Sequence, residues 1–466
     1  MIKSNPSAVD KKLSHFQTIA FASPTLALFL LVAPMGLLPS IFAKYYGISL
    51  VGLGTVLLLT RFFDVITDVL IGHLSDRYRL KHGTRKPFVV IGGLLTIPCA
   101  YFLVYPLGGE VTVFSFACWS LAFYLAFTLF SIPFYAWAGE ITAVPKERTY
   151  LFSLLAFVGQ IATLLFFVLP LLPMFETQEI TPEVLRFSVF LGACVMLPTL
   201  FILIKISPDG ITPTRQEAEI KPHSAALADY IAIFKSNKPF QLFMGSYLFL
   251  GIGTGMFSGL FFLYVDVFLD LGDEFAKMVM VGLITGLALT PLVYKLALWL
   301  GKRNAWLLST VLLIIAIFYC GTLSPGEAGL NDIIIMQVMI AVWGVCTGII
   351  APAMLNDTAD YGLLTLEDGA RGVYFALYIF ILKIGSALGL SAGLALAGWL
   401  GFDATATQQT ADGTFAIRFA TCWLPMAITC LGLYFIAKTP LSEAKMEIIG
   451  RRLQARAKRS AAAFQQ

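Results

Sequence analysis

The sequence has little charge for its length. Aspartate, glutamate, lysine and arginine make up 13% of its 466 residues, whereas hydrophobic residues make up 58%. This balance excludes an ordinary soluble domain, in which about a quarter of the residues carry charge. Apolar runs of about 20 residues, the length that crosses a bilayer as a helix, recur along the chain instead. The composition therefore predicts an integral membrane protein.

Clustered histidine and cysteine are also missing. The four histidines stand apart from one another, and the seven cysteines occur singly inside apolar runs without CxxC spacing. Isolated cysteines in such runs behave as small buried hydrophobic side chains, and haem or metal sites need ligands that come together. These absences argue against a haem or metal enzyme. No small-residue cleavage site follows the first apolar run, so we expect no cleaved signal peptide.

Twelve apolar runs predict an all-α protein with twelve transmembrane helices. The predicted spans are 16–43, 48–75, 87–108, 111–139, 149–174, 185–206, 239–268, 275–300, 304–323, 332–354, 371–400 and 415–438. The longest polar break separates six spans from six, as in transporters built from two repeated bundles. The predicted parts are an N-terminal six-helix bundle at 1–206, a cytoplasmic linker at 207–238, a C-terminal six-helix bundle at 239–440 and a basic cytoplasmic tail at 441–466.

Basic residues gather in alternate loops. They concentrate at 77–86, 146–148, 235–238, 302–303 and 451–459, whereas the intervening loops at 108–110 and 324–332 are acidic or neutral. Cytoplasmic loops carry an excess of lysine and arginine. We therefore expect both termini in the cytoplasm, which agrees with an even number of spans.

The second predicted helix carries charges that a membrane interior disfavours. Arg61, Asp64 and Asp68 follow at spacings of three and four, so they project from one face of a helix. Each such charge costs on the order of 2.5–3.5 kcal/mol in the bilayer centre. Two interpretations stay open: an Arg61–Asp64 ion pair, which leaves Asp68 over, or a cation site that binds Na⁺ or accepts a proton.

Two further predicted helices contain polar side chains at depth. Thr128 and Ser131 lie one turn apart and, with Tyr124 and Tyr135, either line a wet cavity or bond back to their own helix. Lys383 lies near mid-membrane in the eleventh helix, too deep to reach the interface easily. We expect this lysine to face an acid or an anionic group of a solute.

Four blocks of sequence carry a family resemblance. They are RFFDVITDVLIGHLSDRYRLKHGTRKPFVVIGG at 61–93, TLFSIPFYAWAGEITAVPKERT at 128–149, MLNDTADYG at 354–362 and FILKIGSALG at 380–389. In their order and spacing the chain resembles the glycoside-pentoside-hexuronide:cation symporters of the major facilitator superfamily. The resemblance spans nearly the whole chain and implies a major facilitator fold, transport of a sugar or glycoside, and coupling to Na⁺ or H⁺.

The resemblance also implies roles for individual residues. The cation ligands would be two acids and two hydroxyls: Asp64, Asp68, Thr67 and Thr128. Lys383 would lie close enough to tune them. From the residues themselves we also expect coupling or substrate contacts at Lys383, Arg61, Ser131, Tyr135 and Tyr124. The cytoplasmic gate would contain four charged residues: Asp76, Arg77, Asp357 and Asp360. The last two are expected in loop and gate contacts before the eleventh helix.

The substrate site departs from the family pattern. The family's best-known sugar site uses acids on the first and fourth helices, but the first helix here has no charge and Ser131 stands at the second position. The aromatic residues available there make the site more apolar: Phe123, Phe127, Phe134, Tyr135 and Phe375. A sugar or glycoside is the first expectation, and a more hydrophobic or lipid-like solute is the alternative.

Two other classes of protein compete with a transporter. An intramembrane enzyme would pair carboxylates from two facing helices rather than from neighbouring turns of one helix, and no GxGD motif occurs. A receptor or scaffold would not need the intramembrane charges. We therefore predict a transporter that is no enzyme, needs no cofactor besides a coupling Na⁺ or H⁺, and has a small-molecule solute and the lipid bilayer as partners. It would bind no nucleic acid and work as a monomer in a bacterial inner membrane.

Overall fold

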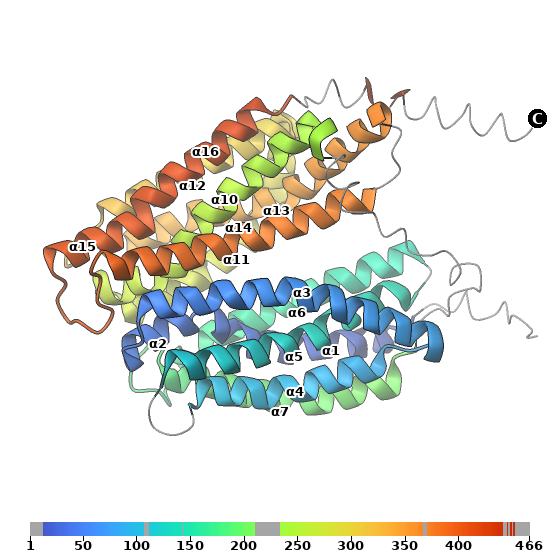
Figure 1. Cartoon of the computed structure of the whole chain (residues 1–466), viewed down its shortest axis with the longest axis horizontal. Helices are drawn as coiled ribbons and strands as arrows, with labels where there is room; N and C mark the ends of the chain where they lie inside the picture. Colours follow the sequence, from blue (N-terminus) through green and yellow to red (C-terminus); the bar gives the residue numbers. More distant parts are fainter. Residues whose placement is uncertain are drawn as a thin grey trace, which may run out of the picture. The chain divides into compact units, whose positions relative to one another are not determined.

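The fold is helical throughout the part of the chain that the structure describes. The computed structural model describes residues 13–106, 111–142, 144–209, 234–366 and 371–440, with a few isolated positions after them. Within these ranges, twelve helical spans are long and apolar enough to cross a membrane. The predicted all-α fold class and the number of spans are confirmed (Figure 1).

Six of the spans belong to an N-terminal unit. It contains α1 (His15–Val32), η2 (Ala33–Gly36), α2 (Leu38–Tyr46), α3 (Leu50–His82), α4 (Lys86–Val104), α5 (Val113–Glu140), α6 (Pro145–Val168), η3 (Leu169–Leu171) and α7 (Pro182–Ile206). Helix α1 packs on α6 and α7, α4 packs on α5 and α7, and α3 packs on α5. The contact between α3 and α5 matters most here because both helices carry predicted site residues.

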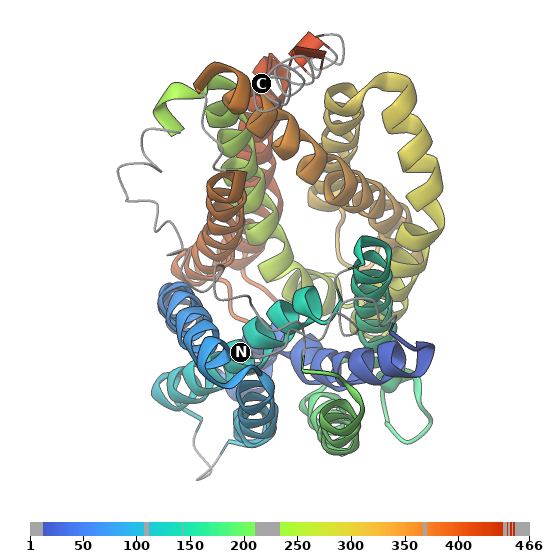
Figure 2. The same cartoon turned by 90° about the vertical axis from the view of Figure 1, so that its right-hand side faces the viewer.

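The other six spans form a C-terminal unit. It contains α10 (Lys238–Leu263), η4 (Tyr264–Phe268), α11 (Gly272–Leu300), α12 (Lys302–Thr322), α13 (Leu330–Leu366), α14 (Arg371–Trp399), α15 (Ala411–Arg418), η5 (Phe419–Trp423) and α16 (Leu424–Lys438). Helix α10 packs on α14 and α16, and α12 packs on α13 and α16. Figure 2, viewed along the helices of Figure 1, shows the helices of each unit gathered into a bundle.

The division into two compact units falls inside the predicted linker. One unit comprises Met1–His223 with Gly272–Lys277, and the other comprises Ser224–Leu271 with Met278–Gln466. The first turn of α11 joins the N-terminal unit because the Gln178 backbone N–H donates to Asp273 Oδ1 at 2.9 Å. Most of the linker, at 210–233, and most of the tail lie outside the described residues. The predicted boundaries at 206, 238 and 440 stay predictions.

Glycine allows α10 and α14 to lie unusually close. A Cβ on Gly251 of α10 would lie 3.3 Å from the backbone of Gly385 on α14, and one on Gly255 would collide with the Ser386 carbonyl. Helices in lipid gain little from the hydrophobic effect, so close packing of small residues holds them together. The C-terminal bundle is therefore built around this tight pair.

The first predicted helix, at 16–43, is interrupted. Helix α1 ends at Val32, a short η2 follows, and α2 begins at Leu38 and continues to Tyr46. Pro34 and Pro39 lack the backbone N–H that an unbroken α-helix would use. The sequence therefore specifies a break that a hydropathy window averages away.

The second predicted helix, at 48–75, extends two turns further than expected. Helix α3 continues to His82 and ends at Gly83, which adopts a left-handed φ of 75°. Arg79, Lys81 and His82 lie in its last turn, where positive side chains stabilise a helix C-terminus. The placement of Arg77, Arg79 and Lys81 in a loop was wrong, because hydropathy marks where the membrane ends and not where the helix ends.

Asp357 and Asp360 were also expected in a loop and lie in a helix. Both belong to α13, which runs from Leu330 to Leu366, whereas the predicted span ended at 354. The polar composition of 356–362 does not stop the helix, because the segment 353–361 contains no proline or glycine. This prediction is corrected in the same way as the end of α3.

Candidate cation and solute site

The polar stripe of α3, formed by Arg61, Asp64 and Asp68, faces the Thr128 hydroxyl of α5. Thr128 Oγ1 lies 3.1 Å from Asp64 Oδ1 and 3.3 Å from Asp68 Oδ1, both within hydrogen-bond distance. Asp64 and Thr128 are buried, at 5% and 1% exposure, and Asp68 is half-buried. One hydroxyl thus serves two carboxylates from successive turns. The predicted residues Asp64, Asp68 and Thr128 therefore come together.

Arg61 stands beside this pair. Its Nη1 lies 3.7 Å from Asp64 Oδ2, and its guanidinium lies over the ring of Tyr124 at 4.9 Å from the centroid. The first distance is long for a charge-assisted hydrogen bond, which is usually 2.7–2.9 Å or so. Arg61 therefore offsets part of the Asp64 charge without occupying the oxygens near Thr128. Both interpretations, the ion pair and the cation site, stay open.

Thr67 is bonded to its own helix. Its hydroxyl donates to the backbone carbonyls of Phe63 and Asp64, each at 3.1 Å, and the residue is 6% exposed. A threonine hydroxyl that donates its proton in this way keeps oxygen lone pairs for another partner. The role of Thr67 as a cation ligand stays a prediction.

The aromatic side chains of α5 divide into a buried and an accessible set. Phe123 and Phe134 are fully buried, and Phe134 stacks on Phe21 of α1 with ring centroids 4.9 Å apart. Their predicted availability to a solute is wrong, since Phe134 fills the core of the unit. Tyr135 is 37% exposed, whereas Ser131 is 8% exposed.

The predicted residues of the C-terminal unit lie apart along the sequence. Lys383 is a half-buried residue of α14, and Phe375 packs against the buried cluster of this unit. Asp357 forms an ion pair with Lys302 at the start of α12, and Asp360 is half-buried one turn further along α13. The proximity of Lys383 to the acids of α3 stays a prediction.

A second charged cluster lies at the C-terminal end of α3. Arg85, between α3 and α4, donates from Nε and Nη2 to Glu140 at 3.0 and 2.8 Å and from Nη1 to Ser75 at 2.7 Å. Asp76 Oδ1 lies 2.6 Å from Arg85 Nη2, and Arg79 Nη1 lies 2.9 Å from Glu140 Oε1. The Arg85 side chain is 4% exposed. A buried cation is thus surrounded by short, charge-assisted bonds.

This cluster contains Asp76, one of the four residues predicted for the gate. Burial would lower the pKa of Arg85, but the hydrogen bonds and charges of Glu140 and Asp76 outweigh it and raise the pKa above its usual value. Asp76 belongs to the cluster, whereas the exposed Arg77 has no hydrogen-bond or ion-pair partner among the described residues. The roles of both residues in a gate stay predictions. Sequence reasoning missed Arg85 and Glu140. A lone acid that ends the apolar run of α5 is the signal that could have revealed them.

Comparisons with known proteins agree with this architecture. Residues 20–443 match a family described as MFS/sugar transport protein. A glucuronide carrier protein homolog of Escherichia coli is 26% identical over 88% of this chain and 89% of its own. A sodium-dependent lysophosphatidylcholine symporter of Danio rerio is 19% identical over 84% of this chain and 80% of its own. The crystal structure of a nucleoside transporter, 14% identical, covers 92% of this chain and 100% of its own at a TM-score of 0.65, and shows the shared fold.

The match to the family covers both helical units and includes the four resembling blocks. Proteins of this family are transporters and not enzymes, which confirms that prediction and removes the intramembrane carboxylate enzyme as an alternative. The chain is a multi-pass membrane protein of the major facilitator superfamily, and it belongs to the MFS/sugar transport protein family.

Proposed function

We propose that this transporter is a symporter that couples a small solute, a sugar or glycoside first of all, to Na⁺ or H⁺ by alternating access. The observation that carries the proposal is the Thr128 hydroxyl between Asp64 and Asp68. This arrangement supports a site at which the two carboxylates share one cation or one proton. The name of the glucuronide carrier homolog supports the solute class.

The physical reason for coupling is the repulsion between the two acids. Asp64 is buried and Asp68 is half-buried in α3, and Arg61 Nη1 lies 3.7 Å from Asp64 Oδ2. A bound Na⁺ or proton removes the remaining penalty of burying like charges close together. The state that binds the cation is then favoured, and solute and cation each raise the affinity for the other by the same factor.

Uptake into proteoliposomes tests the coupling. Purified protein is reconstituted, and solute uptake is measured under an imposed Na⁺ gradient at constant pH, then under a pH gradient without Na⁺. We expect one gradient to drive uptake, and we expect Asp64→Asn and Asp68→Asn to abolish it while solute exchange without a gradient persists. Glu327→Gln, at an exposed acid of the other unit, is the matched control. Undiminished gradient-driven uptake in both aspartate variants would remove the cation site from the proposal.

A lipid-like solute is the second candidate, favoured by the relative named as a lysophosphatidylcholine symporter. The burial of Phe134 against Phe21 weakens the argument for a broad apolar surface on α5. A thermal-shift screen with glycosides, nucleosides and lysophospholipids, repeated with and without Na⁺, separates the candidates. We expect a glycoside to raise the melting temperature more in the presence of the coupling cation. Stabilisation by lysophospholipids alone would reverse the choice of solute.

The proposed orientation has both termini in the cytoplasm of a bacterium, with the protein in the inner membrane. The first turn of α12, at 302–303, and the last turn of α3 carry the positive charge that the positive-inside rule places there. Single cysteines introduced into a cysteine-free variant would be labelled from outside by a membrane-impermeant maleimide only in alternate loops. Labelling of a cysteine at 209 from outside in intact cells would overturn this orientation.

A further inference from the structure

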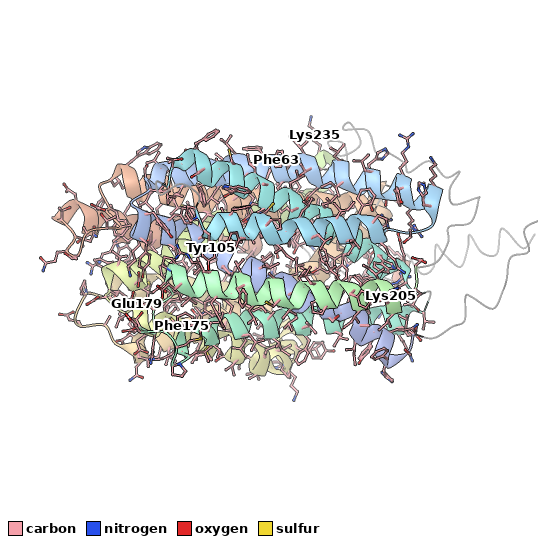
Figure 3. All side chains as sticks on the ribbon, turned by 90° about the horizontal axis from the view of Figure 1, so that it is seen from below. Phe63, Tyr105, Phe175, Glu179, Lys205 and Lys235 are labelled. Carbon is pink, nitrogen blue, oxygen red and sulfur yellow. The ribbon has the colours of Figure 1, made fainter. Side chains whose placement is uncertain are left out.

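A cavity opens at the end of the N-terminal unit where α2 ends and α7 begins. Its volume is about 440 Å³, and it is lined by Tyr45, Tyr46, Phe175, Glu176, Thr177, Thr181, Pro182, Glu183 and Arg186. Sites for small molecules usually enclose about 300–1,000 Å³. Figure 3 places Phe175 and Glu179 towards this end of the unit and Lys205, in the last turn of α7, towards the other. The cavity is thus separate from the acids in the middle of α3.

Arg186 builds one wall of this cavity. Its Nε donates to the Val104 carbonyl at 3.2 Å and its Nη2 donates to the Tyr46 hydroxyl at 3.1 Å. Its guanidinium also lies over the Tyr105 ring, 4.8 Å from the centroid. These three contacts come from α2 and from the end of α4. They hold the guanidinium and the Tyr46 ring in place before any ligand binds, so little order must be gained on binding.

The cavity lining also contains carboxylates with free acceptor capacity. Glu176 and Glu183 are exposed and have no hydrogen-bond or ion-pair partner in the described part of the chain. The neighbouring Glu179 differs, because it accepts from Lys44 at 3.1 Å and from the Tyr45 hydroxyl at 3.3 Å. The cavity therefore has two uncommitted acceptors, one fixed guanidinium and several hydroxyl groups.

The mixture of groups decides between classes of ligand. A phosphate or other inorganic anion would meet the Glu176 and Glu183 carboxylates, and an organic cation would meet Arg186. A neutral ring with many hydroxyls can donate to the carboxylates, accept from the guanidinium and lay its C–H face on Tyr45 or Phe175. Of these three classes, only the last uses every group in the lining.

We propose that this cavity is a second binding site for a neutral polyhydroxylated ligand, the sugar part of a glycoside. The choice of a glycoside rests on the solute class of the proposed function, whereas the site itself does not involve Asp64 or Asp68. Helix α3 begins just after Tyr46 and leads away from the cavity for 33 residues to the Arg85 cluster. In the proposed orientation the cavity lies on the outer face, where a solute arrives first.

The test is saturation-transfer NMR on the full chain in lipid nanodiscs. The probes are the methyl α- and β-pyranosides of glucose and galactose. The protein carries Asp64→Asn and Asp68→Asn and is measured without Na⁺, so that the coupling cation cannot strengthen solute binding at the transport site. We expect at least one probe to bind, and we expect Glu176→Gln with Glu183→Gln to weaken its binding by about tenfold or more, since two charged acceptors are lost.

Two controls separate a site from a structural effect. Glu327→Gln removes an exposed acid of the other unit and should leave binding unchanged, and Phe175→Leu should weaken it without changing the elution of the protein on size exclusion. Absence of a signal from all four probes, or binding that is unaffected by the Glu176 and Glu183 variants, overturns the proposal. So does stronger binding of choline or phosphate. Because gradient-driven uptake is measured separately, failure of this site and failure of symport are distinguishable.

Discussion

Two charged clusters on the same helix, α3, are built in opposite ways. Around Arg85 the contacts are short, from 2.6 to 3.0 Å, and every side chain has a partner of opposite charge or a hydroxyl. Around Asp64 and Asp68 three contacts are longer: Thr128 Oγ1 lies 3.1 Å from Asp64 and 3.3 Å from Asp68, and Arg61 lies 3.7 Å from Asp64. Short contacts between opposite charges stabilise the structure around Arg85, whereas the longer contacts around the two acids agree with the proposed cation site.

Removing Arg85 should give the largest effect, and it tests the cluster with the shorter contacts. Arg85→Ala leaves Glu140 and Asp76 near each other without the buried cation. We expect a loss of about 3 kcal/mol of stability, the lower end for breaking a buried pair, because Asp76 is 62% exposed. Thermal unfolding of the purified protein measures the change.

Arg77→Ala is the matched control for Arg85→Ala. Arg77 is exposed in the same segment and has no partner among the described residues, so its loss should change stability by less than about 0.5 kcal/mol. Equal melting temperatures for the two variants would mean that the Arg85 cluster contributes nothing to stability in detergent.

Replacing Thr128 should have the next largest effect, and it tests the cluster around Asp64 and Asp68. Thr128→Val keeps the shape and removes the hydroxyl, at a cost of about 1–3 kcal/mol for a lost donor to buried carboxylates. If Na⁺ is the coupling ion, the concentration for half-maximal uptake should rise about tenfold. If H⁺ is the coupling ion, uptake driven by the pH gradient should change instead.

The control for Thr128→Val is Thr128→Ser, which keeps the hydroxyl and should stay close to the wild type in both assays. Uptake by Thr128→Val that is unchanged in Na⁺ dependence and in pH dependence would contradict a site organised by this hydroxyl. Whether the Na⁺-driven or the pH-driven uptake changes would also distinguish between the two coupling ions.

Arg61 should give the smallest effect. Arg61→Gln removes a positive charge 3.7 Å from Asp64, so the coupling cation should bind more tightly, by at most about fivefold for a partly exposed pair. Arg61→Lys keeps the charge and serves as the control. The dependence of uptake on cation concentration measures both. A higher cation concentration for half-maximal uptake by Arg61→Gln would mean that Arg61 positions Asp64 instead of competing with the cation.

The sequence predicted the helices well because hydropathy reports directly on the bilayer. Twelve runs of apolar residues could be counted, and the spacing of Asp64 and Asp68 placed both acids on one face without any structure. The ends of α3 and α13 were predicted less well. A helix can leave the membrane and continue, as α3 does to His82, and composition marks only the exit.

The sequence by itself therefore determined the number of helices, the polar stripe of α3 and the resemblance to a transporter family. The tertiary structure alone decided which partners those residues have. Thr128 meets both acids, Thr67 bonds to its own helix, and Arg85 rather than Arg77 forms the buried cluster. The reason is that helical periodicity is local, whereas a contact between α3 and α5 joins residues about sixty positions apart and depends on how the two helices pack.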